Sequence, residues 1–163
     1  MSKYKCTNCG NEQEIVVVEK TITDDIWQNF KRIHFEASGN RITRDSKTWD
    51  FQQQLIMQNR AFMSIISDKN TGKMVGCGYF QYSLQSAIYS SGAYDRTLFS
   101  KPLGHLVQWN AIKHMQKINL KNYYIGRYFT SSDECAPTKK EIDISHFLKG
   151  FTNEISLIWL ATI

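Results

Sequence analysis

The chain has 163 residues, of which 42% are hydrophobic and 21% charged, and its formal net charge is +5. This length suits one domain with its own core, and the composition excludes a disordered, fibrous or disulfide-framework protein. No stretch approaches the roughly 20 apolar residues of a membrane span, and the first residues lack the apolar core of a signal peptide. We therefore expect a cytoplasmic protein without a membrane span, whose basic charge favours anionic partners.

Residues 1–20 differ from the rest of the chain. Cys6 and Cys9 have the spacing of a zinc knuckle, and the β-prone run at 15–18 predicts a short first strand. A closed zinc site needs four ligands, and the other cysteines, Cys77 and Cys135, are isolated in the sequence. The pair is therefore half a motif, and we do not favour zinc as a cofactor. Zinc held by Cys6 and Cys9, a knuckle shared between chains and a knuckle left by truncation stay open.

Two helices are predicted next. Thr23-Asp24-Asp25 is a good N-cap, and apolar residues then recur at helical spacing until Gly39. Ser46 is expected to cap a second helix that ends near Asn59. Because no linker or repeat follows, we treat residues 21–163 as a single domain.

The remaining sequence predicts a three-stranded antiparallel meander, a long helix, a further strand, a polar loop, a short helix and a closing strand. These elements cover residues 61–67, 74–83, 87–93, 103–118, 122–129, 130–141, 144–151 and 155–163. A helix that crosses from a meander to a parallel strand makes a mixed sheet. The expected fold is α/β (α+β), with a mixed central sheet and helices on both faces.

Six motifs between Ile33 and Phe151 add a family resemblance. They are, in chain order, HFEASGNRITR at 34–44, SKTWD at 46–50, VGCGYF at 75–80, YDRTLF at 94–99, HLVQWNAIKH at 105–114 and FLKGF at 147–151. Together with the element order, they make the sequence similar to the FemAB-like branch of the GNAT superfamily of N-acyltransferases.

This resemblance implies transfer of an acyl or aminoacyl group from an activated donor to an amine of a sugar nucleotide, glycan or cell-wall precursor. The implied donor is acetyl-CoA or another acyl-CoA, and aminoacyl-tRNA is the alternative. Nucleic acid is a partner only if tRNA is the donor. Related Fem-type proteins pair two such domains, so a homodimer also stays open.

In GNAT proteins the donor's pyrophosphate lies on backbone N–H groups at the start of the long helix, where the helix dipole favours an anion. The resemblance carries this role to Lys101, Leu103, Gly104, His105 and Leu106. The family pattern is only partly met, because Leu106 stands where a small residue is usual and Pro102 removes one N–H. We therefore expect coenzyme A binding to be less secure than the fold.

Amine acylation needs a group that accepts a proton, donors for the developing oxyanion and a group that protonates the leaving thiol. The candidates are Asp95, just beyond the third meander strand, Tyr128, near the strand expected to splay from its neighbour, and His146. Each also has a structural reading: a surface ion pair for Asp95, a cleft wall for Tyr128 and simple packing for His146.

Basic residues supply the candidates for acceptor binding. Arg41 and Arg44 lie in the predicted loop between the first two helices, and the planar guanidinium fork suits carboxylate or phosphate. The other candidates are Arg96, Arg127 and Lys149. The structural alternative is ordinary solubilising charge.

Two other functions compete with acyl transfer. A zinc-knuckle module could bind RNA or a protein through the Cys6–Cys9 segment and exposed aromatics, and metal content would reveal it. A degenerate GNAT domain that has lost donor binding is consistent with Pro102, Leu106 and Leu148.

Overall fold

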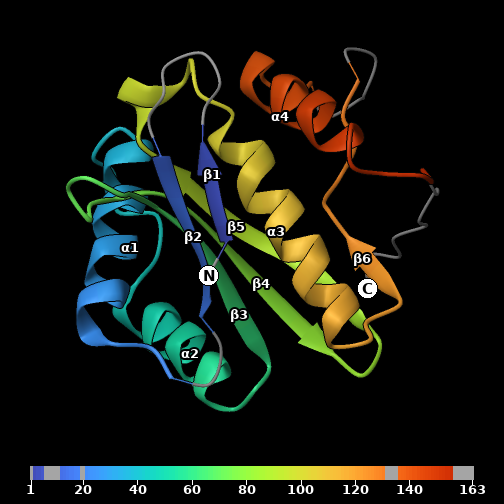
Figure 1. Ribbon diagram of the computed structural model, residues 1–163. Coiled ribbons are helices and arrows are strands. Elements are labelled where there is room, and N and C mark those ends of the chain that lie inside the picture. The colour runs from blue at the N-terminus through green and yellow to red at the C-terminus, as the bar shows by residue number, and fades with distance from the viewer. Residues whose placement is uncertain (1, 6–11, 19–20, 131–135, 156–163) are drawn as a thin grey trace. The chain divides into compact units, whose positions relative to one another are not determined.

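The computed structural model describes residues 2–5, 12–18, 21–130 and 136–155, with side chains from residue 21 onward. It forms two compact units, Met1–Tyr124 and Ile125–Ile163, which are treated separately below. The first unit holds a six-stranded sheet in the order β1-β2-β3-β4-β5-β6 with helices on both faces (Figure 1). The predicted boundary near residue 20 stays a prediction.

The first helices begin at side-chain caps. Helix α1, Asp24–Ala37, starts as predicted, with the Thr23 hydroxyl accepting the Ile26 N–H. Helix α2, Ser46–Met57, is capped by Asp45, whose Oδ1 accepts the Thr48 N–H at 2.8 Å. The prediction that Ser46 is the cap was therefore wrong by one residue, because the adjacent aspartate caps equally well.

The sheet confirms the predicted meander and its mixed character. Its strands are β1 Ser2–Lys5, β2 Glu12–Val18, β3 Ala61–Asp68, β4 Met74–Ser83, β5 Ser86–Tyr94 and β6 Asn122–Tyr124. All neighbours are antiparallel except β5 and β6, which are parallel. The predicted strand at 122–129 ends early, at Tyr124, and Gly126 at φ +137° has left strand geometry.

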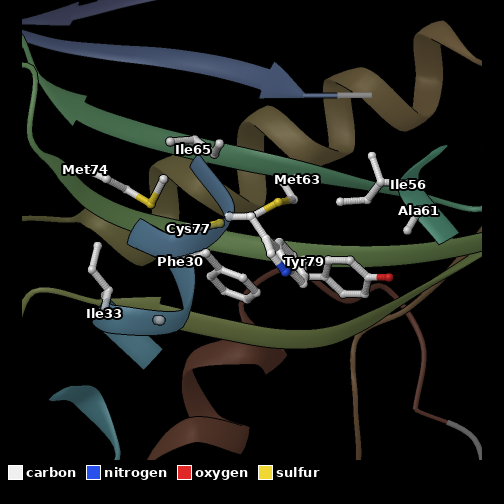
Figure 2. Packing of buried hydrophobic residues seen from close by; sticks show 11 residues of the cluster. Phe30, Ile33, Ile56, Ala61, Met63, Ile65, Met74, Cys77 and Tyr79 are labelled. Carbon is white, nitrogen blue, oxygen red and sulfur yellow. The ribbon is translucent and has the colours of Figure 1, made fainter. Parts of the chain in front are cut away.

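Two hydrophobic clusters sandwich the sheet because alternate residues of a strand point to opposite faces. On one face, called the α1 face, Phe30 of α1 stacks on Tyr79 of β4 at a ring-centroid distance of 6.4 Å (Figure 2). On the other, the α3 face, helix α3, Leu103–Lys117, packs Val107 against the sheet. This packing is close at Gly78, where an added Cβ would lie 2.6 Å from Val107 Cγ1.

The second unit contains helix α4, Lys139–Lys149, where residues 144–151 were predicted. The helix begins earlier because Thr138 and Glu141 form a capping box: the Thr138 hydroxyl accepts the Glu141 N–H at 3.3 Å, and the Glu141 carboxylate accepts the Thr138 N–H at 2.8 Å. The predicted closing strand at 155–163 lies outside the described residues except for Ile155, which is not in a strand. Within the described part of the chain, no helix is both long and apolar enough to cross a bilayer.

Candidate functional site

Several predicted site residues gather at one end of the sheet. Strand β5 ends there, the short 3-10 helix η1, Arg96–Leu98, follows, and α3 begins a few residues later (Figure 1). Helix α1 ends there too. The Arg96 guanidinium donates a hydrogen bond to the Ala37 carbonyl, so the last residue of α1 lies beside η1. This end of the sheet therefore joins the start of α3 on one face to the end of α1 on the other.

The start of α3, the predicted donor site, is an uncapped helix N-terminus. Pro102 is the N-cap, no side chain caps the turn, and the Pro102 carbonyl accepts the Leu106 N–H at 3.0 Å. Pro102 thus lacks one of the N–H groups that a helix start usually offers, and the Leu103 N–H already donates to the Lys101 carbonyl at 2.8 Å. Gly104 lies within this turn, without a side chain to shield its backbone N–H from a ligand.

Two other residues of the predicted donor turn face the core. The Leu103 side chain is buried, and Leu106 is partly buried against the cluster on the α3 face. The expected obstruction by Leu106 therefore does not follow from its size alone, because its side chain packs toward the sheet. His105 is exposed and Lys101 is half-buried, so both side chains can reach a ligand at the turn.

A β-bulge interrupts β5 on the way to this end of the sheet. Tyr79 pairs with Ser91, but the next residue, Phe80, pairs with Tyr89, so Ser90 has no partner on β4. Bulges free backbone groups from the ladder and are over-represented beside active sites. The ladder between β5 and β6 also ends here, since its last pair joins Ile88 to Tyr124.

Two buried polar atoms flank this bulge. Ser91 shares the α1 face with its cross-strand partner Tyr79, and Gln108 lies on α3. Neither Ser91 Oγ nor Gln108 Nε2 has a hydrogen-bond partner within the described residues. Buried polar atoms are normally satisfied, so these two are the best-placed hydrogen-bonding groups for a bound molecule.

The α3 face next to the bulge carries a neutral hydroxyl and amide network. The hydroxyls of Tyr89 and Tyr94 lie 3.3 Å apart, and the Tyr123 hydroxyl donates to Gln108 Oε1 at 2.5 Å. Burial raises the pKa of Tyr89 to about 12 and raises the pKa of Tyr94 well above its usual value. These phenols therefore stay protonated at neutral pH and donate hydrogen bonds without charge.

On the α1 face, three of the predicted arginines converge on the last turn of α1. Arg41 Nε donates to the Ser38 carbonyl at 3.0 Å, and Arg96 donates to the neighbouring Ala37 carbonyl. The Arg44 guanidinium donates to His34 Nε2, one turn earlier. We call Arg41, Arg44 and Arg96 the arginine cluster.

Arg44 is the most tightly held member of the arginine cluster. Its Cζ lies 5.1 Å from the centroid of the Trp49 ring, and burial lowers the pKa of its guanidinium. Burial, together with the charge of Arg44, lowers the pKa of His34 to about 4. The His34 ring is therefore neutral at pH 7 and can accept the hydrogen bond from Arg44.

Asp95 lies beside this cluster but is engaged in local structure. Its Oδ1 accepts hydrogen bonds from the Thr97 hydroxyl at 2.6 Å and the Thr97 N–H at 3.0 Å, and its Oδ2 lies 3.5 Å from Lys73 Nζ. The Thr97 hydrogen bonds, with a smaller contribution from the Lys73 charge, lower the pKa of the Asp95 carboxyl. These contacts favour a capping role, and general-base catalysis by Asp95 stays a prediction.

The second unit brings three predicted residues together. The rings of Tyr128 and His146 stack with centroids 6.2 Å apart, and Lys149 Nζ lies 5.2 Å from the Tyr128 centroid. Arg127 instead lies over the Phe129 ring, with Cζ 4.8 Å from its centroid. Stacking and a cation–π contact thus group these three side chains within the second unit, and proton transfer by Tyr128 and His146 stays a prediction.

The predicted metal pair is not placed by the structure. Cys6 and Cys9 lie outside the described residues, and the described part of the chain holds no group of three or more His, Cys, Asp or Glu residues arranged around a metal site. Cys77 is buried on the α1 face, where burial raises the pKa of its thiol. A thiol in that state is a poor ligand and a poor nucleophile.

Sequence reasoning missed Ser90, Ser91 and Gln108. A bulge depends on the register of two strands, and nothing in the local sequence marks it. Gln108 did carry a signal, since it interrupts the apolar stripe of α3 between Val107 and Ala111. A polar residue in a buried stripe is a candidate for a specific hydrogen bond.

No protein-family model and no curated protein sequence matches the chain. Solved structures do match. An aminoglycoside acetyltransferase from an uncultured soil metagenomic sample, in complex with sisomicin, has 15% identity and a TM-score of 0.63 over 93% of this chain and 96% of that one.

Two further structures have the same fold. The aminoglycoside acetyltransferase AAC(6')-Iy, in complex with a coenzyme A bisubstrate analogue, has 8% identity and a TM-score of 0.63, covering 93% of this chain and 98% of that one. A ribosomal-protein-alanine N-acetyltransferase from Brucella melitensis has 11% identity and a TM-score of 0.61, covering 93% and 97%. The FemAB-like branch stays a prediction. The mixed sheet, the long crossing helix and these likenesses establish that the chain has the GNAT acetyltransferase fold.

Proposed function

We propose that the chain is an N-acetyltransferase that moves an acetyl group from acetyl-CoA to a primary amine of a sugar, glycan or cell-wall precursor. The observation that carries this proposal is the bulge at Ser90, at the point where the ladder between β5 and β6 ends. On one face it adjoins a neutral hydrogen-bonding network below an uncapped helix N-terminus, and the arginine cluster lies on the other. Two substrates approaching from opposite faces would meet at this strand.

The residues of the α3 face fit acetyl-CoA. The backbone of the turn at Gly104 would hold the pyrophosphate, because the helix N-terminus offers N–H groups and partial positive charge. Lys101 and His105 can add side-chain contacts there. Gln108 Nε2, which has no partner among the described residues, is a donor for an amide carbonyl of the pantetheine arm. Acetyl-CoA supplies the thioester, which an amine can attack directly.

The reaction forms a C–N bond, breaks a C–S bond and moves three protons. The amine first loses its ammonium proton, and its nitrogen then attacks the thioester carbonyl. The backbone groups of Ser90, which have no ladder partner on β4, stabilise the developing oxyanion. As the C–S bond breaks, the leaving thiolate gains a proton and the nitrogen loses its second one, so that a neutral amide and a free thiol result. His146 is the proton acceptor and Tyr128 the proton donor that the sequence predicts, and their rings stack within the second unit. The second nitrogen proton replaces, through solvent, the one that Tyr128 gives up.

Turnover tests this proposal. The purified protein, given acetyl-CoA and glucosamine or glucosamine 6-phosphate, should release free coenzyme A thiol and form an N-acetylated product measurable by mass spectrometry. Tyr128→Phe should reduce kcat by about 10²–10⁴-fold, whereas Tyr124→Phe, at an exposed tyrosine of the first unit, should not. Absence of thiol release with every amine would contradict acetyl transfer and direct the search to aminoacyl-tRNA as the donor or to a degenerate domain.

A further inference from the structure

We propose that the arginine cluster binds an anionic group of the acceptor, so that the amine acetylated by this protein belongs to a molecule that also carries phosphate or carboxylate. This inference rests on the proposed acetyltransferase function and narrows its substrate class. Arg41 and Arg44 come from the loop between α1 and α2, and Arg96 comes from η1. Arg96 lies 59 residues after Ala37 in the chain, yet all three guanidinium groups contact the last turn of α1 or the residue after it.

No carboxylate of the described residues compensates the charge of the cluster. Each guanidinium contacts a neutral group: the Ser38 carbonyl, the Ala37 carbonyl or the His34 imidazole. Over the described residues, no carboxylate pairs with Arg41, Arg44 or Arg96.

Acidic residues around the cluster already have partners, including Asp45, which follows Arg44 and caps α2 by accepting the Thr48 N–H. Glu36 pairs with Arg32 at 2.8 Å, and Asp95 accepts from Thr97 and lies 3.5 Å from Lys73. The C-terminus of α1 contributes only about −0.5 of an elementary charge. The positive charge of three guanidinium groups therefore exceeds the combined negative charge of the helix end and the Asp45 carboxylate.

The guanidinium of Arg44 is also pre-organised. Stacking on Trp49 and the hydrogen bond to His34 fix its plane, so little side-chain entropy remains to be lost when an anion binds. It is half-buried, where its charge is screened less than that of a surface arginine, while Arg41 and Arg96 are exposed and can close around a ligand. A planar fork of this kind matches two oxygens of a phosphate or carboxylate.

The position of the cluster suits an acceptor rather than the donor. It lies on the α1 face, whereas the uncapped start of α3 lies on the other face at the same end of the sheet (Figure 1). Arg96 belongs to the segment that connects β5 to α3, so the anion site and the donor turn are close to each other along the chain. An acceptor anchored by its anion on the α1 face could present its amine at the bulge.

A polycationic amine should be a poor acceptor. Several ammonium groups on one molecule would be repelled by the uncompensated arginines, because like charges brought together at an interface cost several kcal/mol. A sugar amine with one phosphate or carboxylate would instead be attracted.

A matched series of acceptors tests this. Glucosamine, glucosamine 6-phosphate and muramic acid share an amino sugar and differ in carrying no anion, a phosphate or a carboxylate, and sisomicin serves as the polycation. At saturating acetyl-CoA, we expect kcat/KM to be at least about tenfold higher for one of the anionic sugars than for glucosamine, mainly through KM, and lowest for sisomicin. The two anionic sugars distinguish phosphate from carboxylate.

Variants identify the residues responsible. Arg44→Gln and, separately, Arg96→Gln should each lower kcat/KM for the preferred anionic sugar about tenfold more than kcat/KM for glucosamine. Arg32→Gln is the matched control, since Arg32 lies on α1 but pairs with Glu36, and it should change neither value. Because Arg44→Gln could disturb the loop, the Arg96 variant and the ratio of kcat/KM between the two sugars keep the test independent of folding. An equal loss for both sugars in both variants would contradict an anion site.

A donor-free measurement separates failure of this inference from failure of the proposed function. In calorimetric titrations without acetyl-CoA, one of the anionic sugars should bind at least about tenfold more tightly than glucosamine, and Arg44→Gln should abolish the difference. Acetyl transfer with equal kcat/KM for all three sugars, or equal binding of all three, would overturn the anionic acceptor. Selective anion binding without any turnover would support the anion site and contradict acetyl transfer.

Discussion

The two faces of the sheet next to β5 have opposite chemistry. On the α3 face, the polar groups are neutral and buried: two tyrosine hydroxyls with raised pKa values, the amide of Gln108 and the backbone of an uncapped helix turn. On the α1 face, the polar groups are three arginines contacting neutral partners at the end of α1. Under the proposed function, the difference teaches that backbone groups suffice for a constant donor, whereas side-chain charge would select among acceptors.

Under the proposed function, the same difference would also allow an imperfect donor motif. A site that uses backbone N–H groups depends on the helix start, and Leu103 and Leu106 fix that start by packing into the core. The arginine cluster lacks this support from core packing, because each of its contacts depends on one side chain.

The largest expected effect is on the free energy of unfolding, and it distinguishes a buried residue of the α1 face from an exposed one. Phe30→Ala should lower the free energy of unfolding by about 3–5 kcal/mol, because Phe30 is fully buried among aromatic rings (Figure 2). Phe51→Ala is the matched control on α2, where the ring is 57% exposed. It should change the free energy of unfolding by about 0.5 kcal/mol or less. Urea unfolding measures both, and equal losses would contradict the described packing.

The next effect is a pH dependence specific to the α1 face. The pKa of His34 is lowered to about 4 in the folded protein, so between that pH and the ordinary value near 6.5 the unfolded chain binds more protons. Stability from this group is therefore complete above about pH 6.5 and is lost as the pH falls toward 4. After allowance for solvent screening of a half-exposed ring, we expect a loss of about 1–2 kcal/mol.

A comparison of variants isolates this contribution. Unfolding free energies measured at pH 7.0 and 4.5 should differ less for His34→Gln than for the native protein. His105→Gln, at an exposed histidine of α3, should retain the native difference. A native pH dependence in His34→Gln would show that other groups cause it.

The smallest expected effect concerns the α3 face. Gln108→Leu removes a buried amide whose Nε2 has no partner in the described residues but also removes the acceptor of the Tyr123 hydroxyl. We expect stability to change by no more than about 1 kcal/mol and the Kd for acetyl-CoA to rise about fivefold to tenfold. Gln116→Leu, at an exposed position of the same helix, should leave the Kd unchanged. An unchanged Kd in Gln108→Leu would remove Gln108 from the donor site.

Elements with strong local patterns could be predicted from the sequence. Helix α1, the meander and α3 were predicted closely, because caps and apolar periodicity are local signals. The early start of α4 carried a readable capping box at Thr138 and Glu141 that the prediction overlooked. The early end of β6 could not be read, because it depends on where the neighbouring strand stops pairing.

In the candidate site, too, local sequence signals could be read and long-range contacts could not. The sequence predicts arginine, tyrosine and histidine as candidates for anion binding and proton transfer, and these roles stay predictions. Their grouping was not predicted, because the contact of Arg96 with Ala37 joins segments that are far apart in the chain. Tyr128, His146 and Lys149 meet through the return of α4 onto the preceding segment, which periodicity does not encode.

The most direct test of the donor site is thermal unfolding with and without millimolar acetyl-CoA. At 100 times its Kd, the ligand should stabilise the native protein by about 2.7 kcal/mol and raise its Tm accordingly. Gly104→Leu, which keeps a good helix former but shields the backbone of the turn, should lose this shift, whereas Arg44→Gln should retain it. An unchanged Tm of the native protein, or an equal shift in Gly104→Leu, would contradict the assignment of the start of α3 as the acetyl-CoA site.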